Sequence, residues 1–137
     1  MASRNGAWDR SAARRRDEAW AAYAEAKVRW MAGQLDFTHD GGESYAEIRR
    51  RVVPAFQALA RRHPGETIVV VAHGVVIRVL LTSLLEGHSP ADFERIAIDF
   101  VAINDLRHDG ARWRAEVLGA RAVDEESNGW SEGPGAP

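Results

Sequence analysis

The chain of 137 residues contains no cysteine and no long apolar run. The absence of cysteine excludes disulfide bonds and thiolate metal sites, and it fits a reducing compartment. No stretch approaches the roughly 20 apolar residues that cross a bilayer, and the start of the chain lacks the apolar core of a signal peptide. We therefore expect a cytoplasmic protein without a membrane partner.

A large excess of charge of one sign is also lacking, because 18 basic and 20 acidic residues leave a net charge of −2. This balance creates no strong electric field, so we expect no nucleic-acid partner. The five histidines show neither paired nor H-E-x-x-H spacing, and no glycine-rich phosphate loop ends in Gly-Lys-Ser/Thr. We therefore expect no metal and no other cofactor.

Helical patterns fill the first half of the chain. Residues 11–32 predict an amphipathic helix, because four apolar residues recur at helical spacing. These are Trp20, Ala24, Val28 and Met31. Ser44 is predicted to cap a second helix with an apolar face of its own. That face consists of Ile48, Val52, Phe56 and Leu59.

The second half alternates strand and helix patterns, which indicates an α/β fold. Residues 67–72, Thr-Ile-Val-Val-Val-Ala, form a β-branched run typical of a central strand covered on both faces. A buried helix from Val75 to about Leu85 is expected next. Asp109-Gly110 predicts a hairpin turn between strands within 95–106 and 112–118. Residues 122–137 are polar and rich in Gly and Pro, so we expect a domain over 1–121 and a disordered tail over 122–137.

His73 lies at the junction of the expected central strand and the helix that follows it. In open α/β folds, ligands bind at this carboxyl edge of the sheet. The first turn of the helix presents unpaired N–H groups, and Gly74 lets an anion approach the backbone closely. An imidazole beside such a site can donate a hydrogen bond to phosphate. The pattern indicates phosphate chemistry; the alternative is a core histidine that hydrogen-bonds a backbone carbonyl.

Three stretches resemble the second half of the histidine phosphatase superfamily, which includes cofactor-dependent phosphoglycerate mutases and broad phosphomonoesterases. They are Gly-Gly-Glu-Ser (41–44), Pro-Gly-Glu-Thr (64–67) and Val-Val-Val-Ala-His-Gly-Val-Val-Ile-Arg (69–78), within a resemblance that covers about 6–118. The resemblance implies a three-layer α/β/α phosphoglycerate mutase-like sandwich. It also implies that His73 is the second histidine of a phosphate pocket and that the Gly74 N–H is a further donor to the phosphoryl group.

The chain departs from the family pattern at the nucleophile. The family's nucleophilic histidine belongs to an Arg-His-Gly motif on the opening strand, and this sequence contains no Arg-His-Gly. The phosphate-clamping arginines and the acidic proton donor of the family are also missing. We therefore expect a domain truncated at the N-terminus. It would belong to a phosphomonoesterase or mutase-like enzyme acting on small phosphorylated metabolites, and it would be inactive alone.

Two other functions stay open on the sequence. One is a non-catalytic phosphate-binding or interaction module, and the other is a structural protein with a generic strand-turn-helix. In the truncated domain, the apolar strand over 67–72 would lack its neighbour and expose an unpaired edge. We therefore expect marginal stability and self-association through this edge.

Overall fold

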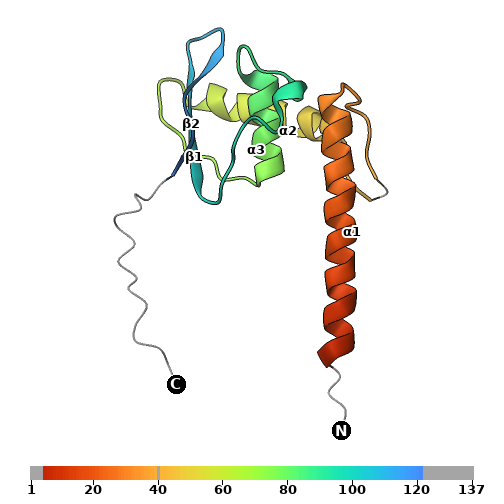
Figure 1. Cartoon of the computed structure of the whole chain (residues 1–137). Coiled ribbons are helices and arrows are strands. Elements are labelled where there is room, and N and C mark those ends of the chain that lie inside the picture. Colours follow the sequence, from red (N-terminus) through yellow and green to blue (C-terminus); the bar gives the residue numbers. More distant parts are fainter. Residues whose placement is uncertain (1–4, 40, 122–137) are drawn as a thin grey trace, which may run out of the picture.

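The computed structural model describes residues 5–39 and 41–121, with side chains from residue 15 onward. Within these residues the chain forms three α-helices, a short 3-10 helix and a two-stranded hairpin (Figure 1). The elements are α1 (Asn5–Met31), α2 (Tyr45–Arg62), α3 (Gly74–Leu84), η1 (Pro90–Asp92), β1 (Ala102–His108) and β2 (Trp113–Arg121). The helices and the antiparallel hairpin fit the expected α/β fold. The expected tail over 122–137 lies outside the described residues.

Helix α1 forms but begins earlier than predicted, and its expected apolar face is wrong except for Met31, which packs against the core. Trp20 and Val28 are each 63% exposed, and the helix turns a different face to the core. Trp30, which is 3% exposed, explains this rotation. Its Nε1–H donates to the Phe37 carbonyl over 2.8 Å, and its ring packs edge-on against the ring of Tyr45. This buried indole therefore fixes which side of α1 faces the core.

Helix α2 begins where the sequence predicts. The Glu47 N–H donates to Ser44 Oγ over 3.2 Å, and the Ser44 N–H donates to Glu47 Oε2 over 2.8 Å. This reciprocal capping box satisfies two amides that the first helical turn leaves unpaired. On the predicted apolar face, Ile48 is buried, and the Phe56 ring lies 5.1 Å from the ring of Trp113 in the hairpin.

Helix α3 joins two apolar clusters. The first surrounds the fully buried Val79 and contains Trp30, Tyr45 and Phe93. The second is formed by Leu81, Leu85 and Ile96, with side chains of the hairpin packed against it. The mostly apolar sequence of α3 is therefore explained, because this helix is covered on more than one side.

The hairpin forms around the predicted turn, although β1 begins later than expected. Asp109 Oδ1 accepts hydrogen bonds from the N–H groups of Ala111 and Arg112, and Gly110 adopts a φ of 96°. Residues 95–101 precede β1 as irregular chain rather than strand. Gly119 brings β2 close to this segment, since a Cβ atom there would lie 2.8 Å from the Ala97 carbonyl oxygen.

The predicted central strand over 67–72 does not form as part of a sheet. Residues 66–73 run without a turn or bend, but they pair with no strand in the described part of the chain. Val69 and Val71 are 89% and 93% exposed, so the expected cover on both faces is wrong. A strand needs a neighbour to accept and donate its backbone hydrogen bonds, and the described residues supply none here.

Candidate functional site

His73 is the N-terminal cap residue of α3. Its backbone is extended, with φ −75° and ψ 153°, and its carbonyl accepts the first helical hydrogen bond from the Ile77 N–H over 3.0 Å. The side chain is exposed and makes no capping hydrogen bond. The interpretation of His73 as a core histidine bonded to a carbonyl is therefore wrong, because the ring is open to solvent.

The amides that follow His73 are free to bind an anion. The N–H groups of Gly74, Val75 and Val76 precede the first helical hydrogen bond, so they have no partner within α3. They also stand at the positive end of the helix dipole. A Cβ atom on Gly74 would lie 3.9 Å from Ile98 Cγ2, which is ordinary contact, so packing against the described residues does not itself require glycine here. The three amides and the exposed ring of the preceding His73 are hydrogen-bond donors at the start of α3.

The other histidines do not join this site by any contact within the described residues. Two of them face carboxylates, with His39 3.0 Å from Glu25 and His63 2.7 Å from Glu66. Of the other two, His88 lies within hydrogen-bond distance of a backbone carbonyl, and the centre of the His108 ring lies 4.7 Å from that of the Trp113 ring, with the two planes tilted by 43°.

Arg78, one turn along α3 from the candidate site, has a structural role in the described chain. Its Nε–H donates to the Ile96 carbonyl over 3.2 Å, and its guanidinium lies 5.7 Å from the centre of the Phe93 ring. The charge of Arg78 is therefore tied to the loop before β1 rather than directed at His73. The described residues thus provide hydrogen-bond donors at His73 and Gly74 without an arginine contact beside them.

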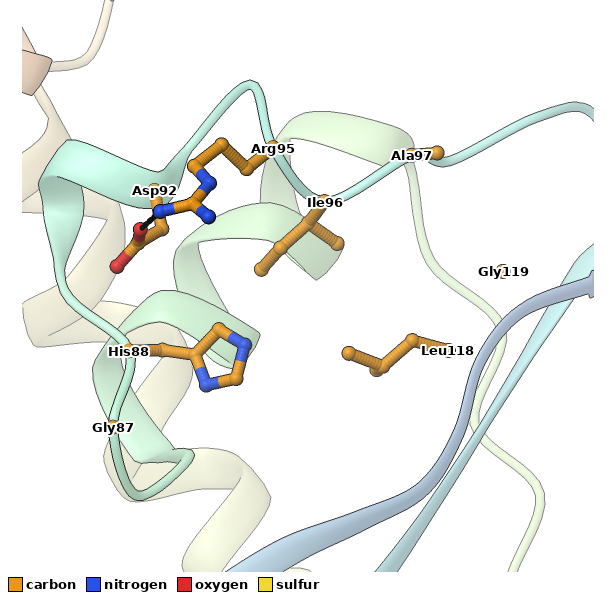
Figure 2. Close-up of a pocket in the computed structure, with 8 residues that line it drawn as sticks. All are labelled: Gly87, His88, Asp92, Arg95, Ile96, Ala97, Leu118 and Gly119. Atoms are coloured by element: carbon orange, nitrogen blue, oxygen red, sulfur yellow. Dashed lines mark hydrogen bonds and ion pairs between the residues drawn. The ribbon is translucent and has the colours of Figure 1, made fainter.

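A hollow of about 400 Å³ lies away from His73, between the loop that follows α3 and the end of β2. Figure 2 shows its lining residues: Gly87, His88, Asp92, Arg95, Ile96, Ala97, Leu118 and Gly119. Hydrogen bonds from the Ser89 backbone N–H and hydroxyl lower the pKa of Asp92, and the positive charge of Arg95 adds to the effect. The sequence offered no signal for this hollow, because its walls come from three separated stretches of chain.

Comparison with known proteins places the chain in a family. The family model of the histidine phosphatase superfamily (branch 1) matches residues 4–121, which is most of the chain. The chain belongs to the histidine phosphatase superfamily. This finding confirms the family inferred from the three sequence stretches, together with the phosphoglycerate mutase-like α/β fold.

Individual relatives agree with the family match. The chain is 38% identical over 88 residues to phosphoglycerate mutase-like protein 4 of Arabidopsis thaliana, covering 64% of this chain and 36% of that protein. It is 28% identical over 67 residues to the metal-independent phosphoserine phosphatase of Arabidopsis thaliana, covering 49% and 28%. It is 33% identical over 69 residues to phosphoserine phosphatase 1 of Hydrogenobacter thermophilus, covering 50% and 33%. The matched parts thus span about a third of the length of these curated relatives.

Two features are absent from the part of the chain that the structure describes. Among the side chains of residues 15–39 and 41–121, no cluster of three or more histidine, aspartate or glutamate residues could hold a metal ion. No helix within residues 5–39 and 41–121 combines the length and the apolar character needed to cross a bilayer.

Proposed function

We propose that this chain is the phosphate-binding part of a phosphomonoesterase or mutase-like domain that acts on small phosphate esters. The observation that carries the proposal is the exposed His73 imidazole directly before the unpaired amides of α3. Membership of the histidine phosphatase superfamily supports it, as do two relatives that are named phosphoserine phosphatases. The substrate class is therefore a phosphorylated small molecule.

In this proposal His73 and Gly74 stabilise charge on the phosphoryl group. The ring N–H of His73 donates to one phosphoryl oxygen, and the Gly74 N–H donates to another. Donors that are already in place where charge develops lower the barrier without reorganisation during the reaction. Phosphoryl transfer in this family also needs a nucleophilic histidine, which this sequence lacks in its Arg-His-Gly context. The chain alone is therefore inactive, and a separate segment must supply the nucleophile.

Phosphate binding is tested by NMR titration of the full chain with inorganic phosphate. We expect the His73 ring and the Gly74 amide to shift together, and His73→Ala to weaken the response at Gly74. His88→Ala is the matched control, because it removes an imidazole that is remote from the start of α3, and it should leave the response unchanged. A response that is absent, or that is the same in His73→Ala, removes the proposed site.

Catalysis is tested by adding a peptide that carries an Arg-His-Gly strand and measuring hydrolysis of p-nitrophenyl phosphate. We expect hydrolysis only with the peptide present, and its loss in His73→Ala. Hydrolysis that survives His73→Ala would contradict the role of His73. Phosphate shifts without any turnover would favour the second candidate, a non-catalytic phosphate-binding or interaction module.

The proposed domain covers residues 1–121, and residues 122–137 are proposed as a tail that phosphate binding does not need. A chain that ends at Arg121 should therefore show the same phosphate response as the full chain. A lost response would show that the tail belongs to the functional unit. The cytoplasmic location stays a prediction, which imaging of the tagged chain in cells would check.

A further inference from the structure

The hollow between the loop after α3 and the end of β2 has walls that are held in place by the fold. On one side, hydrogen bonds from the Ser89 N–H and hydroxyl to Asp92 fix the loop around η1. On the other side, β2 lies so close to the loop before β1 that a Cβ atom on Gly119 would lie 2.8 Å from the Ala97 carbonyl oxygen. The volume of about 400 Å³ is at the small end of the roughly 300–1,000 Å³ that small-molecule pockets have. The hollow is therefore a preformed space of a size that suits a small ligand.

Part of the lining is apolar. Ile96 is buried within the second apolar cluster, whereas Leu118 extends from β2 and is 38% exposed. Figure 2 shows the Leu118 side chain and the His88 ring pointing toward each other across the hollow, with Ile96 beside them. A ligand that covers Leu118 removes apolar surface from water, which stabilises the complex. This part of the hollow therefore suits an apolar group.

The charged groups of the hollow differ in how far their hydrogen-bonding capacity is used. Asp92 Oδ2 accepts the Ser89 N–H over 2.9 Å and the Ser89 hydroxyl over 3.2 Å, and Asp92 Oδ1 lies 3.2 Å from Arg95 Nη1. The Nε–H and Nη2 groups of Arg95 make no hydrogen bond to the described residues. The carboxylate of Asp92 is thus occupied, while Arg95 keeps donors for a ligand.

His88 adds a ring nitrogen that has no partner in the described part of the chain. Its Nδ1 lies 3.2 Å from the Glu86 carbonyl oxygen, and a carbonyl only accepts, so Nδ1 carries the hydrogen. Nε2 is left for a ligand: it donates to an anion when the ring is protonated, and it accepts from a hydroxyl when the ring is neutral. His88 and Arg95 therefore form the polar end of the hollow.

We propose that this hollow binds a small organic monoanion, a carboxylate with an apolar body. The carboxylate of the ligand contacts Arg95 and His88, and its apolar body lies between Ile96 and Leu118. Asp92 is ionised at neutral pH, because hydrogen bonds lower its pKa. Its charge disfavours a second negative charge on the ligand. The hollow therefore differs in ligand class from the proposed phosphate site at the start of α3.

The test is an NMR titration of the full chain with phenylacetate at neutral pH. We expect the methyl signals of Leu118 and Ile96 to shift and to saturate, with a dissociation constant of about 1 mM. Phenylacetamide has nearly the same shape without the charge, and it should bind about tenfold more weakly. Phenyl phosphate carries about two negative charges and should also bind this hollow more weakly. If phenylacetate binds no more tightly than either analogue, the proposal is overturned.

A substitution that fills the hollow locates the ligand. Leu118→Trp places an indole in the space and should abolish the saturable shift at Ile96. Val117→Trp is the matched control, because Val117 is 43% exposed and successive residues of a strand point to opposite faces. It should bind phenylacetate as the unchanged chain does. Binding that survives Leu118→Trp, or an equal loss in both variants, would overturn the proposal.

Substitutions at the polar end test the contacts to the carboxylate. His88→Asn keeps an N–H group for the Glu86 carbonyl but removes Nε2, so binding should weaken about fivefold. Arg95→Gln should weaken it about threefold, because the Arg95 side chain is 83% exposed and solvent screens its charge. His63→Asn is the matched control, since His63 faces Glu66 after α2, and it should have no effect. Unchanged affinity in both His88→Asn and Arg95→Gln would overturn the proposal.

The hollow and the proposed phosphate site can fail separately. Inorganic phosphate should shift the Gly74 amide, and phenylacetate should shift the Leu118 methyl groups. A response at Gly74 to phosphate with no response at Leu118 to phenylacetate contradicts the hollow site alone, whereas the reverse result contradicts the phosphate site alone. Phenylacetate shifts that are centred on Gly74 would also overturn the hollow site.

Discussion

The packed region where α2 meets α3 and the segment 67–72 have similarly apolar sequences but opposite environments. Tyr45, Val79 and Phe93 are 0% exposed, whereas Val69 and Val71 are almost fully exposed. A helix satisfies its backbone within its own segment, so α3 needs only side-chain contacts to be buried. A strand also needs a hydrogen-bonded neighbour. The comparison shows that an apolar segment must be buried by other residues, but that its own sequence does not determine which residues bury it.

The test of this contrast with the largest expected effect compares a substitution of one core residue with a substitution of one exposed valine. Phe93→Ala removes a ring that lies 5.6 Å from the Trp30 ring, and we expect a loss of about 3–5 kcal/mol in the free energy of unfolding. Val71→Ala should change it by less than about 0.5 kcal/mol, because its side chain is exposed. Urea unfolding followed by circular dichroism measures both.

A folded reference keeps this test informative if Phe93→Ala does not fold. Phe93→Leu retains most of the buried volume and should lose about 1–2 kcal/mol. A loss at Val71 as large as that at Phe93 would show that 67–72 is packed within the isolated chain. The contrast between the two regions would then fail.

The second test concerns how the hairpin is held against the loop before it. Gly119 has a φ of 68° and lies close to the Ala97 carbonyl, while Gly65 has a φ of 72° with open space around it. Gly65→Ala should cost about 1–2 kcal/mol from backbone strain alone. Gly119→Ala should cost more, because its Cβ would collide with the backbone at 2.8 Å. If Gly65→Ala and Gly119→Ala lower the melting temperature equally, the hairpin can shift away from the Ala97 carbonyl without an energetic cost.

The sequence predicted local structure better than tertiary environment. The Ser44 cap, the helix after His73 and the Asp109-Gly110 turn depend on residues a few positions apart, and all three are present. The rotation of α1 depends on Trp30 packing against residues far along the chain, so helical spacing alone chose the wrong face. The pairing of 67–72 depends on a neighbour that the described residues do not contain.

At the candidate site, too, local features were predictable from the sequence and the tertiary environment was not. The placement of His73 as the residue before α3 was predictable, since a β-branched run followed by His-Gly and a helical pattern sets it locally. The surroundings of its ring were not, because they depend on which other elements pack there. The hollow beside His88 and Asp92 could not be predicted for the same reason, because its walls come from separate stretches of chain.

A third test examines the buried contact between α2 and α3. The Tyr45 hydroxyl lies 2.8 Å from Thr82 Oγ1 and 3.0 Å from Ser83 Oγ. Tyr45→Phe should destabilise the chain by about 1 kcal/mol, because a buried hydrogen bond is lost. Tyr23→Phe is the matched control, since the Tyr23 hydroxyl is buried without a hydrogen-bond partner among the described residues. It should be neutral or slightly stabilising, and a reversed order in urea unfolding would contradict the observed network.

The smallest expected effect is the pH dependence that arises at Asp92, beside the hollow. Its carboxylate accepts the Ser89 N–H over 2.9 Å, and this hydrogen bond holds its pKa below the ordinary value of 3.8 in the folded chain. A depressed folded pKa adds stability above the unfolded pKa, and this stability is lost as the pH falls through the folded pKa. Melting temperatures between about pH 5 and pH 2 should therefore fall less steeply in Asp92→Asn than in the unchanged chain.

Arg95→Ala separates the causes of this pH dependence. The Arg95 guanidinium lies 3.2 Å from Asp92 Oδ1, but its side chain is 83% exposed, so solvent screens its charge. The hydrogen bond from Ser89 contributes more to the depressed pKa than the charge of Arg95 does. Arg95→Ala should therefore keep most of the acid-dependent loss that Asp92→Asn removes. An equal flattening in both variants would assign the effect to the surface ion pair, and the Ser89 cap would then contribute little to holding the loop after α3.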